Sequence, residues 1–174
     1  MGIGQPNDSG QPEGQWWSTM MEDMEGVMKQ AREQCSFDHK ALHHCCGPFP
    51  ALAAGVSFGG GQAIPGNLAH SGVNRKALQK LLCHPSFTHI SNFANGAFAT
   101  WFPRMYQYYH ETLRALYTQD ETLECLFPGS AWPAMSLNFR LATWCYRHTD
   151  GGNLAFGVCV ITNAGKFDPM CSGT

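Results

Sequence analysis

The chain has 174 residues, of which 44% are hydrophobic and 12% aromatic, so it suits one domain with an apolar core. Only 14% of the residues are charged and the net charge is −2, which gives no electrostatic basis for tight binding to nucleic acid. Nineteen glycines and ten prolines indicate many turns and argue against a helical bundle.

The N-terminal sequence has neither the basic segment nor the apolar run of a secretory signal, and no stretch is apolar over the length that spans a bilayer. We therefore expect no membrane association and an intracellular location, in the nucleus or the cytoplasm. In such a compartment the eight cysteines would be reduced thiols. The sequence does not indicate an oligomeric state.

Three helices are predicted after an unstructured start. Residues 1–14 are rich in Gly, Pro, Gln and Asn and are expected to form a disordered tail. Over residues 16–34, apolar side chains recur at three- and four-residue spacing, which predicts a helix whose Met-rich face packs in the core. Further helices are predicted over residues 74–82, with Asn74 as N-cap, and over residues 95–118, with Pro103 in the first turn or at a kink.

Strand signals stand mainly in the second half of the chain. An apolar run over residues 51–58 predicts one early strand, followed by three glycines that allow a sharp turn. After Pro133 the pattern shifts towards a period of two, which predicts strands over residues 135–142 and 154–162, with residues 143–147 as a further candidate. Helices first and strands later is an order typical of an α+β protein.

The polar segment HTDGGN, which begins at His148, separates the last predicted strands. His148 and Asp150 are separated by one residue, so at a strand end both side chains would project to the same side. An imidazole nitrogen and a carboxylate oxygen that converge on one point suit a divalent metal, and a triad of two His and one carboxylate leaves positions open on iron(II). The alternative is a solvated turn in which Asp150 bonds the backbone ahead of Gly151.

The context of this pair is distinctive. It lies in residues 136–169, SLNFRLATWCYRHTDGGNLAFGVCVITNAGKFDP, and upstream stand residues 49–62 (FPALAAGVSFGGGQ), 65–68 (PGNL), 98–103 (FATWFP) and 106–109 (YQYY). Together these strings resemble the first half of the dioxygenase core in fungal proteins similar to the TET/JBP family. Those proteins are iron(II)- and 2-oxoglutarate-dependent oxygenases related to enzymes that oxidise 5-methylcytosine in DNA.

The resemblance implies a site and its cofactors. His148 and Asp150 would be two of three iron(II) ligands, with 2-oxoglutarate as co-substrate and methylated nucleic acid as substrate in complete relatives. Four side chains near the motif in sequence could contact a flipped base, although a solvated Arg and a core Trp would explain the same residues: Arg140, Trp144, Tyr146 and Arg147.

The resemblance also implies elements that these 174 residues do not contain. Similar proteins continue with a Gly-Gly-His strand, the second half of the jelly roll, a distal iron-binding histidine and an arginine that grips the far carboxylate of 2-oxoglutarate. Here no histidine follows His148 and no arginine follows Arg147. We therefore expect a dioxygenase fragment that is inactive as this chain, from a truncated gene copy, an alternative transcript or an imperfect gene model.

The expected fold is α+β, with N-terminal helices packed on an incomplete double-stranded β-helix, or jelly-roll, core. Residues 15–174 would form a single incomplete dioxygenase-like domain. Its helical part would cover residues 15–128 or so, and its jelly-roll strands residues 49–62 and 129–169.

Alternative functions stay open. A Cys/His-rich segment could bind zinc, since three of its side chains would share one helix face; its members are Cys35, His39, His43, His44, Cys45 and Cys46. A thiol nucleophile at Cys145 is disfavoured, because in a strand it would point away from His148. A non-catalytic interaction protein or remnant is the third, with the helices over residues 16–34 and 95–118 binding a partner.

Overall fold

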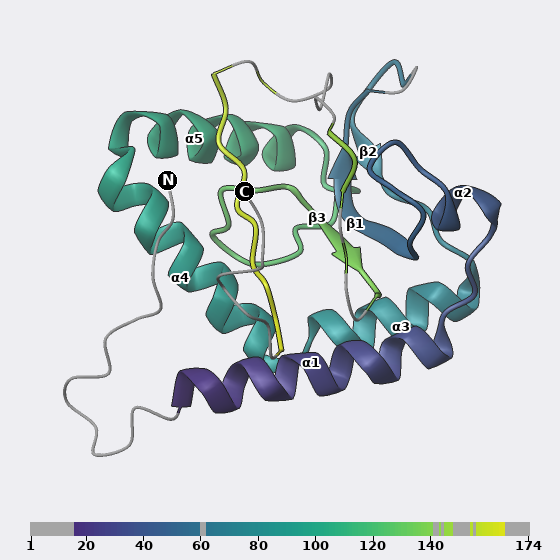
Figure 1. Ribbon diagram of the computed structural model, residues 1–174. Helices are drawn as coiled ribbons and strands as arrows, with labels where there is room; N and C mark the ends of the chain where they lie inside the picture. The colour runs from purple at the N-terminus through teal and green to yellow at the C-terminus, as the bar shows by residue number, and fades with distance from the viewer. Residues whose placement is uncertain are drawn as a thin grey trace.

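The computed structural model describes residues 16–59, 62–140, 143, 145–147, 154 and 156–165. In these ranges the chain is a mixture of helices and an antiparallel sheet, as Figure 1 shows, so the α+β expectation is confirmed at this level. In chain order the elements are α1 (Trp16–Gln34), α2 (His39–Leu42), β1 (Ala51–Ser57), β2 (Gly66–Asn67), α3 (Gly72–Leu82), α4 (Pro85–Trp101), α5 (Pro103–Gln119) and β3 (Ala134–Asn138).

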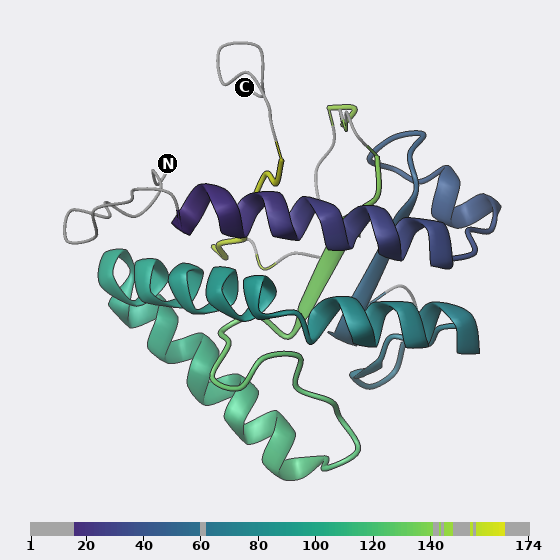
Figure 2. The same ribbon diagram turned by 90° about the horizontal axis from the view of Figure 1, so that it is seen from below.

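Helix α1 forms over the predicted residues and runs beside α3, as both Figure 1 and Figure 2 show, and it also contacts α4. Its predicted Met-rich face is in the core: Met20 and Met24 are 6% and 7% exposed. These side chains pack with Leu78 and Leu81 of α3 and with Phe87 of α4. The packing of this face inside the chain removes it as a surface for a partner.

The sheet has β1 at its centre, with β2 on one side and β3 on the other, and all pairs are antiparallel. The register places Leu52 opposite Leu137, and side chains alternate between faces along a strand. One face therefore carries Leu52, Leu137 and Met135 towards the helical core. The other face carries small or polar side chains, among them Ala53 and Ser136.

Two helix predictions need correction. The helix predicted over residues 95–118 is wrong as one element, because α4 ends at Trp101 and α5 begins at Pro103. Proline at the first position of a helix lacks only a donor that would be unpaired there, so Pro103 starts α5. Asn74 is likewise not an N-cap: Ser71 caps α3 and its hydroxyl accepts from the Asn74 N–H at 3.3 Å.

The strand predictions after Pro133 are only partly confirmed. β3 ends at Asn138, and the described residues among 143–147 and 154–162 are not in strands, so those two predictions are wrong for the part of the chain that is described. The physical reason is that backbone groups there bond to side chains and loops instead of a ladder, as described below. Residues 1–14, the predicted tail, lie outside the described residues.

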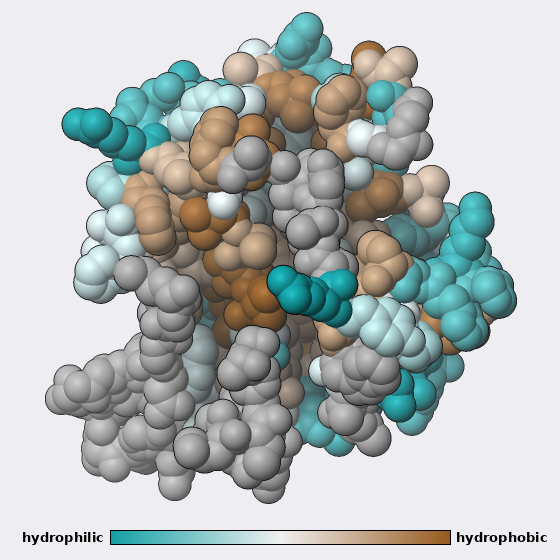
Figure 3. All heavy atoms as spheres, turned by 45° about the horizontal axis from the view of Figure 1, so that its top comes forward, coloured by the Kyte–Doolittle hydropathy of each residue, from teal (hydrophilic) through white to brown (hydrophobic). Residues whose placement is uncertain are grey.

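Apolar side chains gather on the face that carries α5 and the segment 156–165, which Figure 3 shows in brown. Helix α5 contains no buried residue, although its apolar side chains recur along one side. Exposed hydrophobic residues of this region include Phe102, Tyr108, Phe156, Val160 and Ile161.

Candidate metal centre

The predicted ligands His148 and Asp150 lie outside the described residues, as do Trp144 and residues 149 and 151–153. The nearest described neighbours are Arg147 before the motif and Leu154 after it. The structure therefore bears on this site through the two chain segments that flank the motif.

The segment before the motif is tied to the loop that precedes β1. The backbone N–H of Tyr146 donates to the carbonyl of Cys46 at 2.8 Å. Upstream, a guanidinium nitrogen of Arg140 donates to the carbonyl of Pro48 at 3.4 Å, and the Thr143 hydroxyl donates to the Arg140 carbonyl at 3.3 Å. Arg140 and Tyr146, which precede the motif, are thus both hydrogen-bonded to the loop over residues 46–48.

The segment after the motif is tied to α5 and to the loop before β3. The backbone N–H of Val158 donates to the hydroxyl of Tyr109 at 3.0 Å, and the indole N–H of Trp132 donates to the Val158 carbonyl at 3.0 Å. The Tyr109 ring in turn packs on Phe98, which is 3% exposed. Both backbone polar groups of Val158 are therefore held by side chains that the core positions.

Gly157 makes this contact sterically possible. A Cβ at this position would lie 2.5 Å from the Tyr109 hydroxyl oxygen and 2.9 Å from the Leu154 carbonyl oxygen. Contacts below 3.0 Å require a neighbour to shift, and one of these two is backbone. The Gly157 N–H also closes a tight turn by donating to the Leu154 carbonyl at 2.7 Å. Only glycine fits between α5 and this turn.

Charged and aromatic side chains near the motif are accessible to solvent. Cys145, Tyr146 and Arg147 are all exposed, and Tyr146 is 50% exposed. The one ion pair among the described residues, Lys29 with Glu25, lies on α1. Arg147 therefore forms no ion pair with a described residue.

The Cys/His-rich segment does not adopt the geometry expected for zinc. Cys35 lies beyond the end of α1, and α2 contains only four residues, so Cys35, His39 and His43 do not share one helix face. The rings of His39 and His43 stack with centroids 4.6 Å apart, and burial raises the pKa of the Cys35 thiol. Among the described residues, no three His, Cys, Asp or Glu side chains are close enough together to hold a metal ion.

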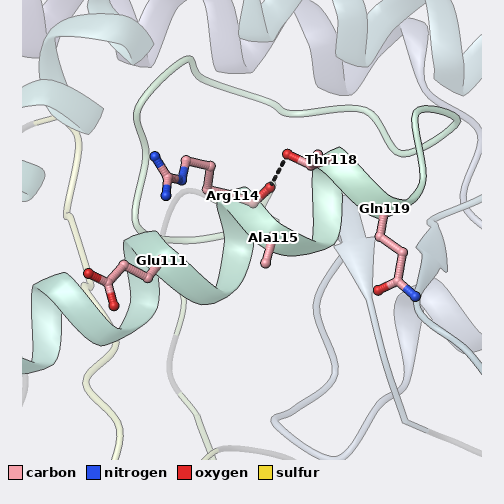
Figure 4. Close-up of a pocket in the computed structure, with 5 residues that line it drawn as sticks. All are labelled: Glu111, Arg114, Ala115, Thr118 and Gln119. Atoms are coloured by element: carbon pink, nitrogen blue, oxygen red, sulfur yellow. Dashed lines mark hydrogen bonds between the residues drawn. The ribbon is translucent and has the colours of Figure 1, made fainter.

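Two hollows in the described surface lack a catalytic arrangement. One, of about 570 Å³, is lined only by α5 residues, and Figure 4 shows that the Thr118 hydroxyl there bonds back to the Arg114 carbonyl at 2.8 Å. The other, of about 450 Å³, lies between the starts of α1 and α4. Its lining includes Asp23, His84 and His89, which do not form a group of three that could hold a metal ion.

Sequence reasoning missed Tyr109 and Trp132 as positioning residues. In the sequence, Tyr109 stands only inside the helix predicted over residues 95–118, and its hydroxyl partner lies in a segment whose backbone was expected to pair in a strand ladder. The one available signal was that a buried Tyr or Trp usually finds a partner for its polar end.

Comparison with protein-family models, with curated proteins and with solved structures found no match to this chain. Within the described residues, no helix has both the length and the apolar character needed to cross a membrane.

Proposed function

We propose that this chain carries the first part of an iron(II)- and 2-oxoglutarate-dependent dioxygenase core similar to that of TET/JBP proteins. In this proposal His148 and Asp150 are two ligands of the iron. The domain is the incomplete jelly roll with N-terminal helices expected from the sequence.

The observation that carries the proposal is that the separate strings behind the resemblance meet in the fold. Residues 49–62 contain β1 and residues 136–169 begin with β3, and these strands pair from Ala51 with Asn138 to Gly55 with Ala134. The string at residues 106–109 supplies Tyr109, whose hydroxyl holds Val158 after the motif. Segments that form one site in a family are expected to lie together in space, and residues 49–62, 106–109 and 136–169 are in contact here.

The proposed chemistry follows from the ligand types. The imidazole of His148 and the carboxylate of Asp150 would hold iron(II), which would supply the redox chemistry that uses 2-oxoglutarate and dioxygen. In complete relatives a distal histidine and an arginine complete the site. Because no histidine follows His148 and no arginine follows Arg147 in these 174 residues, we expect weak iron binding and no turnover by this chain alone.

The proposed substrate class in complete relatives is methylated nucleic acid. Support comes from the exposed Tyr146 and Arg147 directly before the motif, which could stack on a base and contact a phosphate. The net charge of −2 means that such contact would depend on local side chains rather than on the overall field.

An anaerobic calorimetric titration with iron(II) tests the proposal. We expect one weak site per chain that His148→Ala and Asp150→Ala each abolish. The matched control is His110→Ala, since His110 stacks on Tyr106 of α5 and has no proposed metal role. Equal iron binding by wild type, His148→Ala and Asp150→Ala would contradict the proposal.

The alternative, a non-catalytic interaction protein, has one observation in its favour. α5 has an apolar side but no buried residue, and Tyr108 on it is 50% exposed. In α1 the face with Met20 and Met24 is buried within the chain, so a partner of that helix would have to contact its other sides. An iron titration without any binding in the wild type would favour the interaction role for α5.

A further inference from the structure

A pair of neighbouring thiols stands on the loop that precedes β1. The Sγ atoms of Cys45 and Cys46 are 3.7 Å apart, and Cys45 is exposed. No disulfide links the described cysteines, and no other described pair of cysteines shows a contact between sulfur atoms. Cys83 is also exposed, at the end of α3, but no described cysteine lies in sulfur contact with it.

The turn that carries the pair is held on the core. His44 and Gly47 exchange two backbone hydrogen bonds, at 3.3 and 3.0 Å. The Nε2 atom of His44 forms a hydrogen bond with the carbonyl oxygen of Phe49 at 3.0 Å. The His44 ring also packs edge-on against the Phe49 ring, with ring centroids 4.6 Å apart. Phe49 is 1% exposed, so the turn has a fixed anchor. The two thiols are thereby kept at the surface and close to each other.

We propose that Cys45 and Cys46 are a redox-sensitive vicinal dithiol that hydroperoxides convert reversibly to a disulfide. The exposed Cys45 thiolate attacks one oxygen of hydrogen peroxide, which gives a sulfenic acid and hydroxide. The Cys46 thiol then attacks that sulfur, the S–S bond forms, and the sulfenic hydroxyl leaves as water with the thiol proton. In total, two thiols and one peroxide give one disulfide and two waters.

The disulfide would be labile rather than structural. Adjacent Cα atoms across a trans peptide are about 3.8 Å apart, whereas ordinary disulfides join Cα atoms about 4.4–6.8 Å apart. Closing the ring therefore forces the backbone of both cysteines away from its relaxed conformation. Strained, exposed disulfides are the ones that cellular dithiols reduce readily.

Oxidation of the two cysteines should change a hydrogen bond next to the candidate metal ligand His148. The Cys46 carbonyl accepts the backbone N–H of Tyr146 at 2.8 Å, two residues before His148. Ring closure resets the backbone dihedrals of Cys46 and with them the direction of its carbonyl. The Tyr146 hydrogen bond should weaken as a result. This effect does not depend on iron, so it can be measured whether or not the proposed function holds.

Peptide mapping of the full chain tests the proposal. After reduction, one equivalent of hydrogen peroxide and blocking with N-ethylmaleimide, the peptide that contains both cysteines should lose two hydrogens and take up no reagent. Dithiothreitol should reverse this change. Cys83 should stay alkylated in the same sample, and a Cys83→Ser variant should behave as the wild type. Full alkylation of Cys45 and Cys46 while Cys83 is oxidised would overturn the proposal.

Two further measurements keep the test sharp. Phenylarsine oxide bridges two thiols, so it should bind the wild type and the Cys83→Ser variant. Its binding should be absent in both Cys45→Ser and Cys46→Ser. Hydrogen exchange of the Tyr146 amide should speed up about fivefold on oxidation, the factor expected for loss of one net backbone hydrogen bond. Arsenical binding that survives Cys45→Ser, or Tyr146 exchange that does not change, would contradict the vicinal pair or its coupling, respectively.

Discussion

The hydroxyl of Tyr109 on α5 accepts a hydrogen bond from the backbone N–H of Val158 at 3.0 Å. The indole of Trp132 completes the arrangement from the other side by donating to the Val158 carbonyl at 3.0 Å. Two side chains therefore take the place that a neighbouring strand would occupy. They fix the chain eight residues after Asp150 against the helical part of the fold.

Removal of the Tyr109 hydroxyl should loosen this connection with little other change. We expect Tyr109→Phe to lower the free energy of unfolding by about 0.5–1.5 kcal/mol, because the Val158 N–H loses its acceptor while the ring stays packed on Phe98. Urea denaturation measures the change. Tyr108→Phe is the matched control, since Tyr108 is half exposed and should change stability by less than about 0.5 kcal/mol. Equal losses in the two variants would contradict the account.

A side chain at Gly157 should be costly for a steric reason. Its Cβ would lie 2.5 Å from the Tyr109 hydroxyl oxygen, so Gly157→Ala is expected to destabilise the fold by about 1–3 kcal/mol. Gly96→Ala in α4 meets no atom within 4 Å and should instead stabilise the helix by about 0.5–1 kcal/mol. Because the close atom is the hydroxyl, Tyr109→Phe should cost less in the Gly157→Ala background than alone. Additive losses in this cycle would show that the contact is absent.

A helix could be predicted from the sequence where apolar residues recur with helical spacing. It could not be predicted where a capping residue determines the first residue of the helix. α1 formed over the predicted residues because its Met face has a regular period. The start of α4 gave no such signal, since its N-cap is His84, whose Nδ1 accepts the Ser86 N–H at 3.4 Å, an uncommon kind of cap. Asn74 looked like a cap by residue type, but its tertiary partner outweighed local preference.

That partner is the backbone of Ser36. The Asn74 side chain accepts the Ser36 N–H at 2.8 Å and donates to the Ser36 carbonyl at 2.8 Å, while Asn74 itself is 7% exposed. Asn74→Ala would leave two backbone groups without their partner, so we expect a loss of about 2–4 kcal/mol in thermal or urea unfolding. Asn67→Ala, which removes two similar bonds at an exposed position, should cost less. A loss for Asn74→Ala no larger than that for Asn67→Ala would contradict this ranking.

The candidate site could be predicted from the sequence only as a motif. The spacing of His148 and Asp150 and the strings around them indicate a metal pair, but the contacts that position the flanking chain come from distant residues. Cys46 and Tyr109 are far from the motif in sequence, and no local pattern links them to Tyr146 and Val158. Long-range pairs of this kind arise from tertiary packing, which a single sequence does not display.

The 174-residue chain alone should not turn over 2-oxoglutarate. His148 and Asp150 alone would hold iron(II) weakly, and among these 174 residues no arginine after Arg147 could orient the keto acid. Incubation with iron(II), ascorbate, 2-oxoglutarate and methylated DNA should release no succinate above the level of a His148→Ala control. Succinate release that depends on both His148 and Asp150 would show that an unforeseen residue or a second chain completes the site.

Paramagnetic broadening by manganese(II), a divalent stand-in for iron(II), tests the central claim most directly. In a spectrum of the labelled full chain, we predict that sub-stoichiometric manganese broadens the backbone amides of Tyr146, Arg147 and Leu154, which flank the motif. The amides at the far end of α3, such as that of Lys80, should keep their intensity, and the effect should vanish in His148→Ala and Asp150→Ala. Broadening centred on His39 and His43 instead, or broadening that survives both substitutions, would contradict the assignment of His148 and Asp150 as metal ligands.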